Sequence, residues 1–309
     1  MNIVRVALAV PLPRFFDYLY SPDLTPIVGG RVLVPFGSQK RVGIVVDLPA
    51  SSDVAKEKLK PIIDVLDTES LFNSTTWDWL AWSANYYRAA LGDVLFQALP
   101  VKLRNGESAV KNDRTFWRIT DLGKQALESG ELKRAKKQIE ALNLLLTQDL
   151  EKGNNEISSA IWSALKGKDY VEEIIVPSEQ KSWQQALGDN PLVNLDNRLI
   201  LNKQQALAFS QLLFQEGFNV WLLEGVTGSG KTEIYLQYIE EVLKKGKQVL
   251  VLVPEIGLTP QTVRRFQARF NVEIDVLHSN LNDTQRLNVW ERARTGQSAI
   301  VIGTRSALF

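Results

Sequence analysis

Residues 225–232 have the types and spacing of a phosphate-binding loop. Gly225, Val226, Thr227, Gly228, Ser229, Gly230, Lys231 and Thr232 match G-x-x-x-x-G-K-[ST] at every fixed position. Glycines let a backbone wrap around oxygens, and N–H groups at a helix start attract an anion. Lys231 is placed to reach the β and γ phosphates of a nucleotide, and the Thr232 hydroxyl to hold Mg²⁺. The alternative is a glycine-rich turn that binds nothing.

The elements around this loop favour the phosphate-binding interpretation. After Leu201, apolar runs alternate with amphipathic ones. We expect strands at 219–225, 248–254, 272–277 and 298–303, and helices at 231–245, 259–270 and 284–295. Continuous apolar strands that alternate with helices predict a parallel sheet covered on both faces.

The loop alone does not choose between nucleotide-binding classes. The guanine-reading Asn-Lys-x-Asp is absent, because Asn202-Lys203 lies upstream of the loop and is followed by glutamines. Hydrolysis also needs an acidic group at the end of a neighbouring strand. Glu255 follows the strand at 248–254 and Gly303-Thr304-Arg305 ends the last one, so neither strand ends in Asp.

The N-terminal part begins as a small β structure. Strand patterns occupy residues 2–9, 31–36 and 41–48, with Gly37-Ser38-Gln39-Lys40 as a hairpin turn. A helix is expected between Ser74 and Leu91, with Thr75 or Thr76 as its N-cap. Trp77, Trp79 and Trp82 spread around that helix, so we expect at least one of them to pack inside, and we favour a core role over a base-stacking stripe. Residues 106–114 are typical of a linker.

The middle of the chain predicts a strand at 116–120, helices at 132–146 and 157–168, and a strand at 170–177. Short helices that end in a β ribbon fit a winged-helix module, and a small α/β spacer fits them equally well. Residues 178–198 are polar and punctuated by Gly and Pro, which indicates a second linker.

Length and composition set limits on the class of protein. The 309 residues suit two or three units, and the 45% apolar and 23% charged content is that of a folded soluble protein. No apolar run is long enough for a membrane span, and no secretory signal is present. Zero cysteines and a single histidine, His278, leave no thiolate or multi-histidine metal site and favour the reducing cytoplasm. With a net charge of +1, any contacts to nucleic acid must come from a few placed groups.

Four runs in the last third, LLEGVTGSGKTEIYL, VLVPEIGLTPQTVRRFQARF, VLHSNLNDTQRLNVW and AIVIGTRSALF, resemble the first motor lobe of superfamily 2 helicases, and most closely the bacterial replication-restart helicases of the primosomal protein N′ family. VALAVPLPRFFDYLY, GRVLVPFGSQKRVGIVV and LKPIIDVLD are similar to that family's DNA 3′-end-binding domain. The resemblance implies a multidomain chain that combines α/β and α+β units. Its parts are a β-rich 3′-end-binding domain at 1–106, a winged helix at 107–180, a linker at 181–200 and an incomplete first RecA-like P-loop lobe at 201–309.

The same resemblance assigns roles to individual residues. Gln205 takes the place that reads adenine, although without the family it is only a polar helix start. A second group takes the place of the motifs that grip the phosphates of one DNA strand: Thr259, Gln261, Thr304 and Arg305. A third group matches the pocket for a terminal 3′ nucleotide: Phe16, Asp17, Gly37 and Lys60. For His278, a role at the DNA face and a packing role stay open.

The family's activity is ATP-dependent 3′→5′ movement on single-stranded DNA and restart of abandoned replication forks. The resemblance implies ATP and Mg²⁺ as cofactors, and forked or single-stranded DNA with a free 3′ end, primosome proteins and single-strand DNA-binding protein as partners. It places the acidic box, the zinc-binding cysteines, the second lobe and the arginine finger after Phe309. We therefore expect this chain to bind fork DNA without ATP turnover. The alternatives are a DNA-end-binding module with a remnant P-loop, or a P-loop small-molecule kinase.

Overall fold

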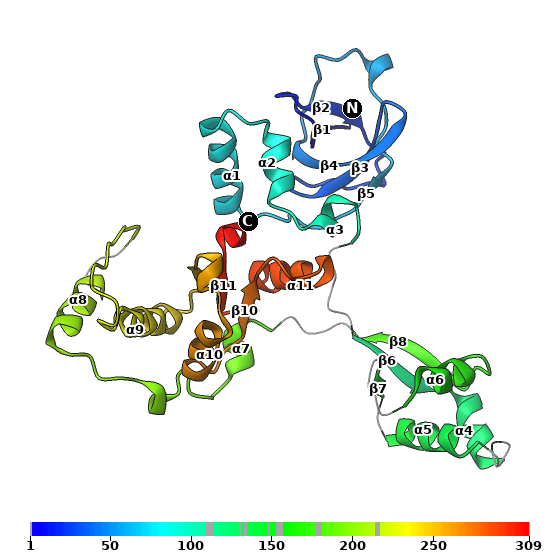
Figure 1. Ribbon diagram of the computed structural model, residues 1–309. Helices are drawn as coiled ribbons and strands as arrows, with labels where there is room; N and C mark the ends of the chain where they lie inside the picture. Colours follow the sequence, from blue (N-terminus) through cyan, green and yellow to red (C-terminus); the bar gives the residue numbers. More distant parts are fainter. Residues whose placement is uncertain are drawn as a thin grey trace. The chain divides into compact units, whose positions relative to one another are not determined.

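The computed structural model describes residues 2–108, 114–129, 132, 135–147, 149–152, 157–176, 181–213 and 217–308. The chain forms two compact units, one made of residues 1–109 together with 181–309, and the other of residues 110–180 (Figure 1). Parts of both expected linkers and the start of the helix expected at 132–146 lie outside the described residues. Within the described ranges, no helix combines the length and apolarity that crossing a membrane requires.

The N-terminal sheet has five antiparallel strands in the order β2-β1-β4-β3-β5. They are β1 (Ile3–Leu8), β2 (Phe16–Leu19), β3 (Arg31–Phe36), β4 (Gln39–Asp47) and β5 (Asp64–Val65). The expected strands and hairpin are confirmed, whereas β2 and β5 are additional. The β3–β4 turn is Gly37-Ser38, and Gly37 has a φ of +60°, where a side chain is disfavoured. Alternate residues of β1 fill the two faces, with Val6 in one core and Ala7 in the other.

Three helices cover one face of this sheet: α1 (Ser74–Tyr86), α2 (Leu91–Gln97) and α3 (Val101–Arg104). The expected cap at Thr75 or Thr76 is wrong, because α1 starts earlier and the Asn73 side chain accepts from the Thr76 N–H at 2.8 Å. Trp77 and Trp79 pack partly buried against the core. Trp82 does not, since it is 55% exposed and stacks on Tyr86.

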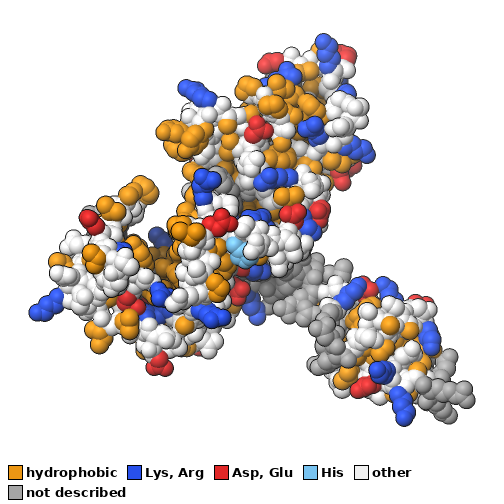
Figure 2. Space-filling model, in the orientation of Figure 1, with side chains coloured by type: hydrophobic (Ala, Val, Ile, Leu, Met, Phe, Trp, Pro, Cys, Tyr) orange, Lys and Arg blue, Asp and Glu red, His pale blue; other side chains and the backbone are white. Residues whose placement is uncertain are grey.

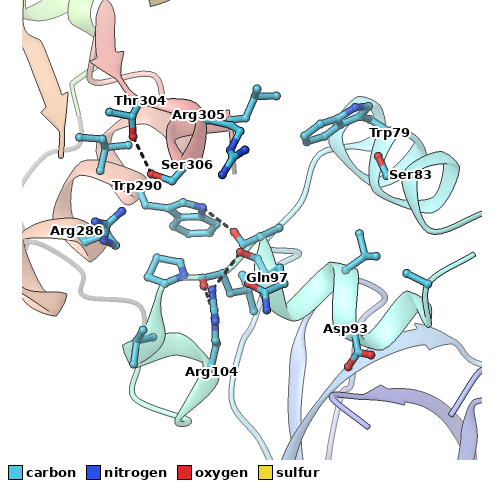
Figure 3. A pocket seen from close by; sticks show the side chains of 18 of the residues that line it. Trp79, Ser83, Asp93, Gln97, Arg104, Arg286, Trp290, Thr304, Arg305 and Ser306 are labelled. Carbon is cyan, nitrogen blue, oxygen red and sulfur yellow. Dashed lines mark hydrogen bonds between the residues drawn. The ribbon is translucent and has the colours of Figure 1, made fainter. Parts of the chain in front are cut away.

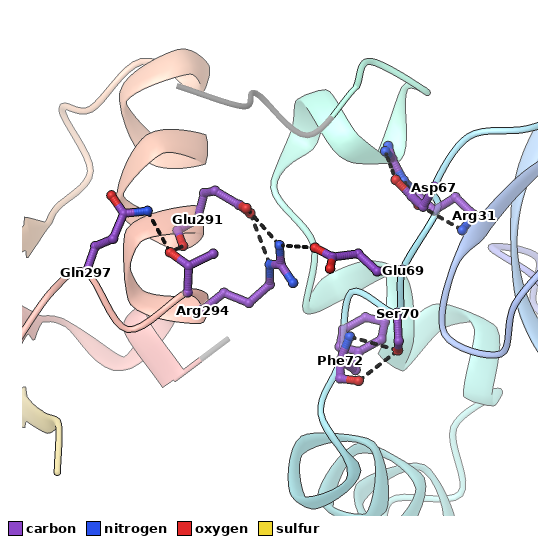
Figure 4. Close-up of polar contacts among 9 residues, drawn as sticks. Arg31, Asp67, Glu69, Ser70, Phe72, Glu291, Arg294 and Gln297 are labelled. Carbon is purple, nitrogen blue, oxygen red and sulfur yellow. Dashed lines mark hydrogen bonds and ion pairs between the residues drawn. The ribbon is translucent and has the colours of Figure 1, made fainter. Parts of the chain in front are cut away.

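A buried arginine joins the N-terminal sheet to helix α3. The Arg31 guanidinium is fully buried and pairs with both oxygens of Asp67 at 2.8 Å (Figure 4). Its Nη1 also donates to the backbone carbonyls of Leu103 and Glu107, at 2.6 and 2.8 Å. A buried charge is tolerated only with partners of this kind, and Arg31 thereby ties the start of β3 to α3 and to the segment that follows α3.

The lobe that carries the phosphate loop has a parallel sheet in the order β10-β11-β9. Its elements are α8 (Lys203–Leu213), α9 (Lys231–Lys244), β9 (Val249–Leu252), α10 (Pro260–Arg269), β10 (Ile274–Leu277), α11 (Asp283–Arg294) and β11 (Ile300–Gly303). Ile300 and Ile302 lie in a core with α9 and α10, whereas Val301 packs with Val289 of α11. The expected parallel sheet with cover on both faces is therefore confirmed.

One expected strand of this lobe is wrong. Residues 219–225, which lead into the phosphate loop, form no strand, and Val220 and Leu222 are 83% and 90% exposed. A strand exists only where a neighbour pairs with its N–H and C=O groups, and an apolar sequence does not supply that neighbour. The strand that follows residues 219–225 most closely along the chain is β9, which lies at an edge of the sheet. The side chains of its Leu250 and Leu252 are 47% and 46% exposed.

The segment 181–200 packs on the lobe. It contains α7 (Trp183–Leu187) and a 3₁₀ turn at Leu195–Asn197. Trp183 is buried with α9 and α10, and its N–H donates to the carbonyl of Gly296 at 2.9 Å. The Ser182 and Gln185 side chains form a capping box that starts α7.

The second unit has the order strand, helix, helix, strand, helix, strand. Its elements are β6 (Arg114–Ile119), α4 (Asp121–Glu128), α5 (Lys136–Thr147), β7 (Leu150–Glu151), α6 (Ser159–Lys166) and β8 (Val171–Val176). The three strands form an antiparallel sheet in the order β7-β6-β8. Trp117 and Trp162 stack at 5.2 Å in its core. The helix α4 has no counterpart in the sequence-based expectation.

Candidate functional site

The phosphate loop has the backbone that its glycines allow. Gly228 and Gly230 have φ values of +82° and +84°, and α9 begins directly after Gly230, which is its N-cap. The loop is thus a left-handed turn at the positive end of a fourteen-residue helix. This arrangement suits an anion.

The Lys231 side chain is folded back onto the loop itself. Its ammonium donates to the carbonyl of Val226 at 3.0 Å and to that of Gly225. Both acceptors are neutral, so a phosphate oxygen would be a stronger partner for the same ammonium. Thr232 is exposed in the first turn of α9.

Gln205 connects the helix α8 to the phosphate loop. Its Oε1 accepts from the Asn202 N–H at 2.9 Å, and its Nε2 donates to the Ser229 carbonyl at 2.8 Å. The space that a side chain at Gly230 would need is taken by the Gln205 amide. Both ends of this amide are therefore in use within the protein.

A buried ion pair that sequence reasoning missed holds the first turn of α9. Glu233 and Arg269 of α10 lie 2.7 Å apart, with side chains 9% and 1% exposed. Arg269 also donates to the Asn197 carbonyl at 2.6 Å. No local sequence pattern marks two residues 36 positions apart as partners. The signals that could have suggested this pair are a Glu directly after the phosphate loop and an Arg among the apolar residues of a helix.

The other nominated residues gather where β9, β10 and β11 end, a region called here the carboxyl edge. Ser279 after β10 donates to Glu255 after β9 at 3.0 Å. Thr259 caps α10 by accepting from the Thr262 N–H, and Gln261 is exposed in the first turn of that helix. The Thr304 and Ser306 hydroxyls lie 3.3 Å apart after β11.

A groove of about 1030 Å³ lies between the carboxyl edge and the helices α1 to α3 (Figure 3). Thr304, Arg305 and Ser306 line one wall, and Trp79 and Arg104 line the other. Arg305 is exposed. Burial lowers the pKa of Arg104, whose guanidinium donates to the backbone carbonyls of Leu99 and Gln97.

His278 lies at this edge and makes local contacts. Its Nδ1 accepts from the Asn280 N–H at 3.2 Å, and its carbonyl accepts from Arg286. These contacts shape the turn before α11.

A pocket of about 550 Å³ brings together Phe16, Asp17, Gly37 and Lys60, called here the end pocket. Phe16 packs edge to face against Phe36 at 5.2 Å, and the Arg14 guanidinium lies over the Phe16 ring at 5.0 Å. Phe15, which also lines the pocket, is 44% exposed. Lys60 is exposed, and nothing fills the space beside Gly37.

Asp17 is held from two sides. Register places it opposite Arg5 of β1, and the two side chains make a paired contact at 2.8 and 3.0 Å. The Ser52 hydroxyl donates to Asp17 Oδ2 at 2.6 Å. The hydrogen bonds from Arg5, helped by Ser52, hold the pKa of the Asp17 carboxyl below its usual value. The hydrogen bond to Asp17 in turn raises the pKa of Arg5. Sequence reasoning missed Arg5 and Ser52.

The face drawn in Figure 2 carries interspersed charges. On the face drawn in Figure 2, Lys and Arg side chains lie between acidic and apolar ones and do not gather into one basic patch. Among the described residues, no cluster of three or more His, Cys, Asp or Glu side chains could hold a metal ion. Any nucleic-acid contact must use individual groups such as those above.

Comparison with known proteins identifies both regions. The family model of a 3′ DNA-binding domain matches residues 5–100, and that of DEAD/DEAH box helicases matches residues 202–309. The chain is 75% identical over its whole length to the replication restart protein PriA of Haemophilus influenzae. Along its whole length, this chain is similar to PriA. The match covers 42% of that relative, so the chain spans less than half of it.

More distant PriA proteins match along the same length. The replication restart proteins PriA of Buchnera aphidicola and Synechocystis are 33% and 32% identical, with 100% and 98% of this chain aligned. These matches cover 42% and 45% of the two relatives. The end pocket lies within the first family match, and Gln205 and the phosphate loop lie within the second.

Proposed function

We propose that this chain is the DNA-recognising and nucleotide-binding part of a replication-restart helicase. The observation that carries the proposal is the 75% identity along all 309 residues to a replication restart protein. In the whole protein, ATP hydrolysis drives 3′→5′ movement on single-stranded DNA, and the 3′ end of the leading strand marks the abandoned fork. Primosome proteins and single-strand DNA-binding protein are its proposed partners, in the cytoplasm.

The proposed domains are a 3′-end-binding domain at 1–106, a winged helix at 107–180, a connecting segment at 181–200 and a first RecA-like lobe at 201–309. The winged helix is supported by the three helices and the antiparallel sheet described for the second unit. The lobe is supported by the parallel sheet and the helix that follows the phosphate loop.

For nucleotide, we assign the phosphates to the backbone of residues 225–230 and to Lys231. The left-handed glycines and the start of α9 fit a polyanion, and Lys231 is already turned toward the loop. Thr232 supplies a hydroxyl for Mg²⁺, which when bound neutralises charge on the phosphates. Gln205 is the adenine contact, and to take that role its amide must give up one of its two present partners.

For the DNA strand, we assign phosphate contacts to Thr259, Gln261, Thr304 and Arg305. Hydroxyls, amides and guanidinium groups at the carboxyl edge suit phosphate oxygens. At the 3′ end, Phe16 offers a stacking face, Lys60 a phosphate partner and Gly37 an open approach to the backbone. Asp17 accepts a hydrogen bond from a free 3′-hydroxyl and repels a 3′-phosphate.

The end pocket has a direct test. The chain should bind fork DNA with a 3′-hydroxyl more tightly than the same DNA with a 3′-phosphate, and Asp17→Ala should remove that preference. Fluorescence anisotropy with the two labelled forks measures it. Equal affinity of the unaltered chain for both ends would reject the assignment, and is what a P-loop small-molecule kinase would give.

The expected lack of ATP turnover has a separate test. We expect the 309-residue chain to hydrolyse no ATP with or without DNA, because the acidic motif expected for the family does not follow its strands. A coupled phosphate-release assay measures this. DNA-stimulated turnover by the purified chain would contradict this expectation.

A further inference from the structure

The Asp17 carboxylate is nearly saturated with hydrogen bonds. Arg5 donates to both of its oxygens, and Ser52 donates to Oδ2 at 2.6 Å. An ionised carboxylate offers about four acceptor positions, so about one is left. The Asp17 side chain is only 8% exposed, and a ligand therefore has little access to it.

Two donors hold Asp17, and they are attached differently. Arg5 belongs to β1 and lies opposite Asp17 in the strand register, with two charge-assisted contacts. Ser52 belongs to the irregular segment 49–55, which has no helix or strand. Among the described residues, its bond to Asp17 is the one hydrogen bond that joins this segment to a distant part of the chain.

The Ser52 hydroxyl also has the chemistry of the group that the end pocket is proposed to read. Both Ser52 and a terminal 3′ carbon carry an aliphatic hydroxyl, which donates a single hydrogen bond to a carboxylate. The segment lies at the pocket itself, because Asp53 and Val54 line it beside Asp17.

We infer that the Ser52 hydroxyl occupies the place of the DNA 3′-hydroxyl, and that a 3′ end binds by exchanging with it. The inference rests on the proposed function of the end pocket. Arg5 keeps its paired contact throughout, so Asp17 stays ionised and correctly oriented. Segment 49–55 moves away when the exchange takes place. Ser52 thereby sets how strongly a terminal hydroxyl must compete for the carboxylate.

The test is the affinity of the 309-residue chain for fork DNA ending in a 3′-hydroxyl or in a 3′-deoxy sugar. Ser52→Ala should tighten binding of the hydroxyl end by about 3- to 10-fold, the value of one ordinary hydrogen bond, and leave the deoxy end within about 2-fold. Ser52→Thr keeps a hydroxyl and should restore the affinity of the unaltered chain. Ser51→Ala is the matched control, because Ser51 is exposed in the same segment.

Weaker or unchanged binding of the hydroxyl end by Ser52→Ala would overturn the inference, because Ser52 would then support Asp17 or be irrelevant to it. Failure of the proposed function gives a different result. In that case the unaltered chain would not prefer the hydroxyl end over the deoxy end, and Asp17→Ala would change neither affinity.

Discussion

The end pocket and the phosphate loop differ in how completely the chain itself supports them. The end pocket stands on paired strands, and its central carboxylate accepts three hydrogen bonds from two side chains before any ligand arrives. The phosphate loop follows a segment without strand partners, and its lysine contacts only backbone carbonyls of the loop. In the end pocket, protein groups already make strong hydrogen bonds to the side chain that is proposed to bind the ligand. In the phosphate loop, the protein groups that contact Lys231 are neutral and are weaker partners than a phosphate.

The difference indicates how each site obtains its selectivity or affinity for a ligand. A ligand of the end pocket must displace an existing hydrogen bond, so selectivity arises from exchange between similar donors. A ligand of the phosphate loop gives Lys231 a charged partner in place of neutral ones, so affinity arises from new contacts. Substitutions should then affect stability near the end pocket and ligand binding at the phosphate loop.

The largest effect should come from the buried ion pair of the sheet that carries the end pocket. Arg31→Met leaves Asp67 buried without its guanidinium and should cost about 3–5 kcal/mol of unfolding free energy. Urea unfolding followed by tryptophan fluorescence measures it. Arg41→Met is the control, because exposed Arg41 contacts only the Phe36 ring face at 5.5 Å and should cost less than about 1 kcal/mol. Equal losses in the two variants would show that burial of Arg31 has no special weight.

At the phosphate loop the effect should fall on binding. Lys231→Ala should weaken Mg·ATP binding by about 1.5–3 kcal/mol, the value of hydrogen bonds to a charged group. Its unfolding free energy should change by less than about 1 kcal/mol, because Lys231 now contacts only exposed carbonyls. Titration with a fluorescent ATP analogue measures the affinity, and Lys245→Ala at the far end of α9 is the control. Unchanged affinity would identify the loop as a remnant.

The same two regions show how far the sequence predicts the structure. The β3–β4 hairpin follows from local rules, because its partners are neighbours and Gly37 supplies the turn. The run at 219–225 has an equally apolar pattern, yet it forms no strand, because its partner must come from elsewhere in the chain. Arg5 and Ser52 were missed for a related reason: their pairing with Asp17 depends on strand register and on a loop path. The sequence motifs indicate which residues could contact a ligand. They do not indicate which other groups of the protein bind those residues when no ligand is present.

A smaller effect is expected at the turn beside the end pocket. Gly37→Ala should cost about 1–2 kcal/mol, because a side chain is strained at a φ of +60°. The added methyl meets no atom within 4 Å, so the cost is conformational and not a clash. Gly37→Asn should recover most of the loss, since Asn tolerates left-handed backbone. Thermal unfolding of the two variants measures this, and equal destabilisation by Ala and Asn would contradict it.

The smallest effect is expected for Asp17→Asn, which removes the charge that pairs with Arg5 but keeps an oxygen that can accept hydrogen bonds. Because Arg5 lowers the pKa of folded Asp17 below its unfolded value near 3.9, this contact stabilises the fold above that pH. The stabilisation is lost as pH falls from there toward the lower pKa of the folded state. Asp17→Asn should therefore cost roughly 0.5–1 kcal/mol at pH 7, and less at pH 3. Urea unfolding at both pH values measures the two costs.

Asp47→Asn is the control on the same arginine, because Asp47 is 57% exposed and lies 4.0 Å from Arg5. It should cost less than Asp17→Asn at pH 7. If the Asp17→Asn cost were the same at pH 7 and pH 3, the ion pair would not stabilise the end pocket. The hydrogen-bond exchange with Ser52 would then start from a carboxylate that Arg5 does not keep ionised. The end pocket would in that case resemble the phosphate loop, whose charged side chain also has only weak partners within the protein.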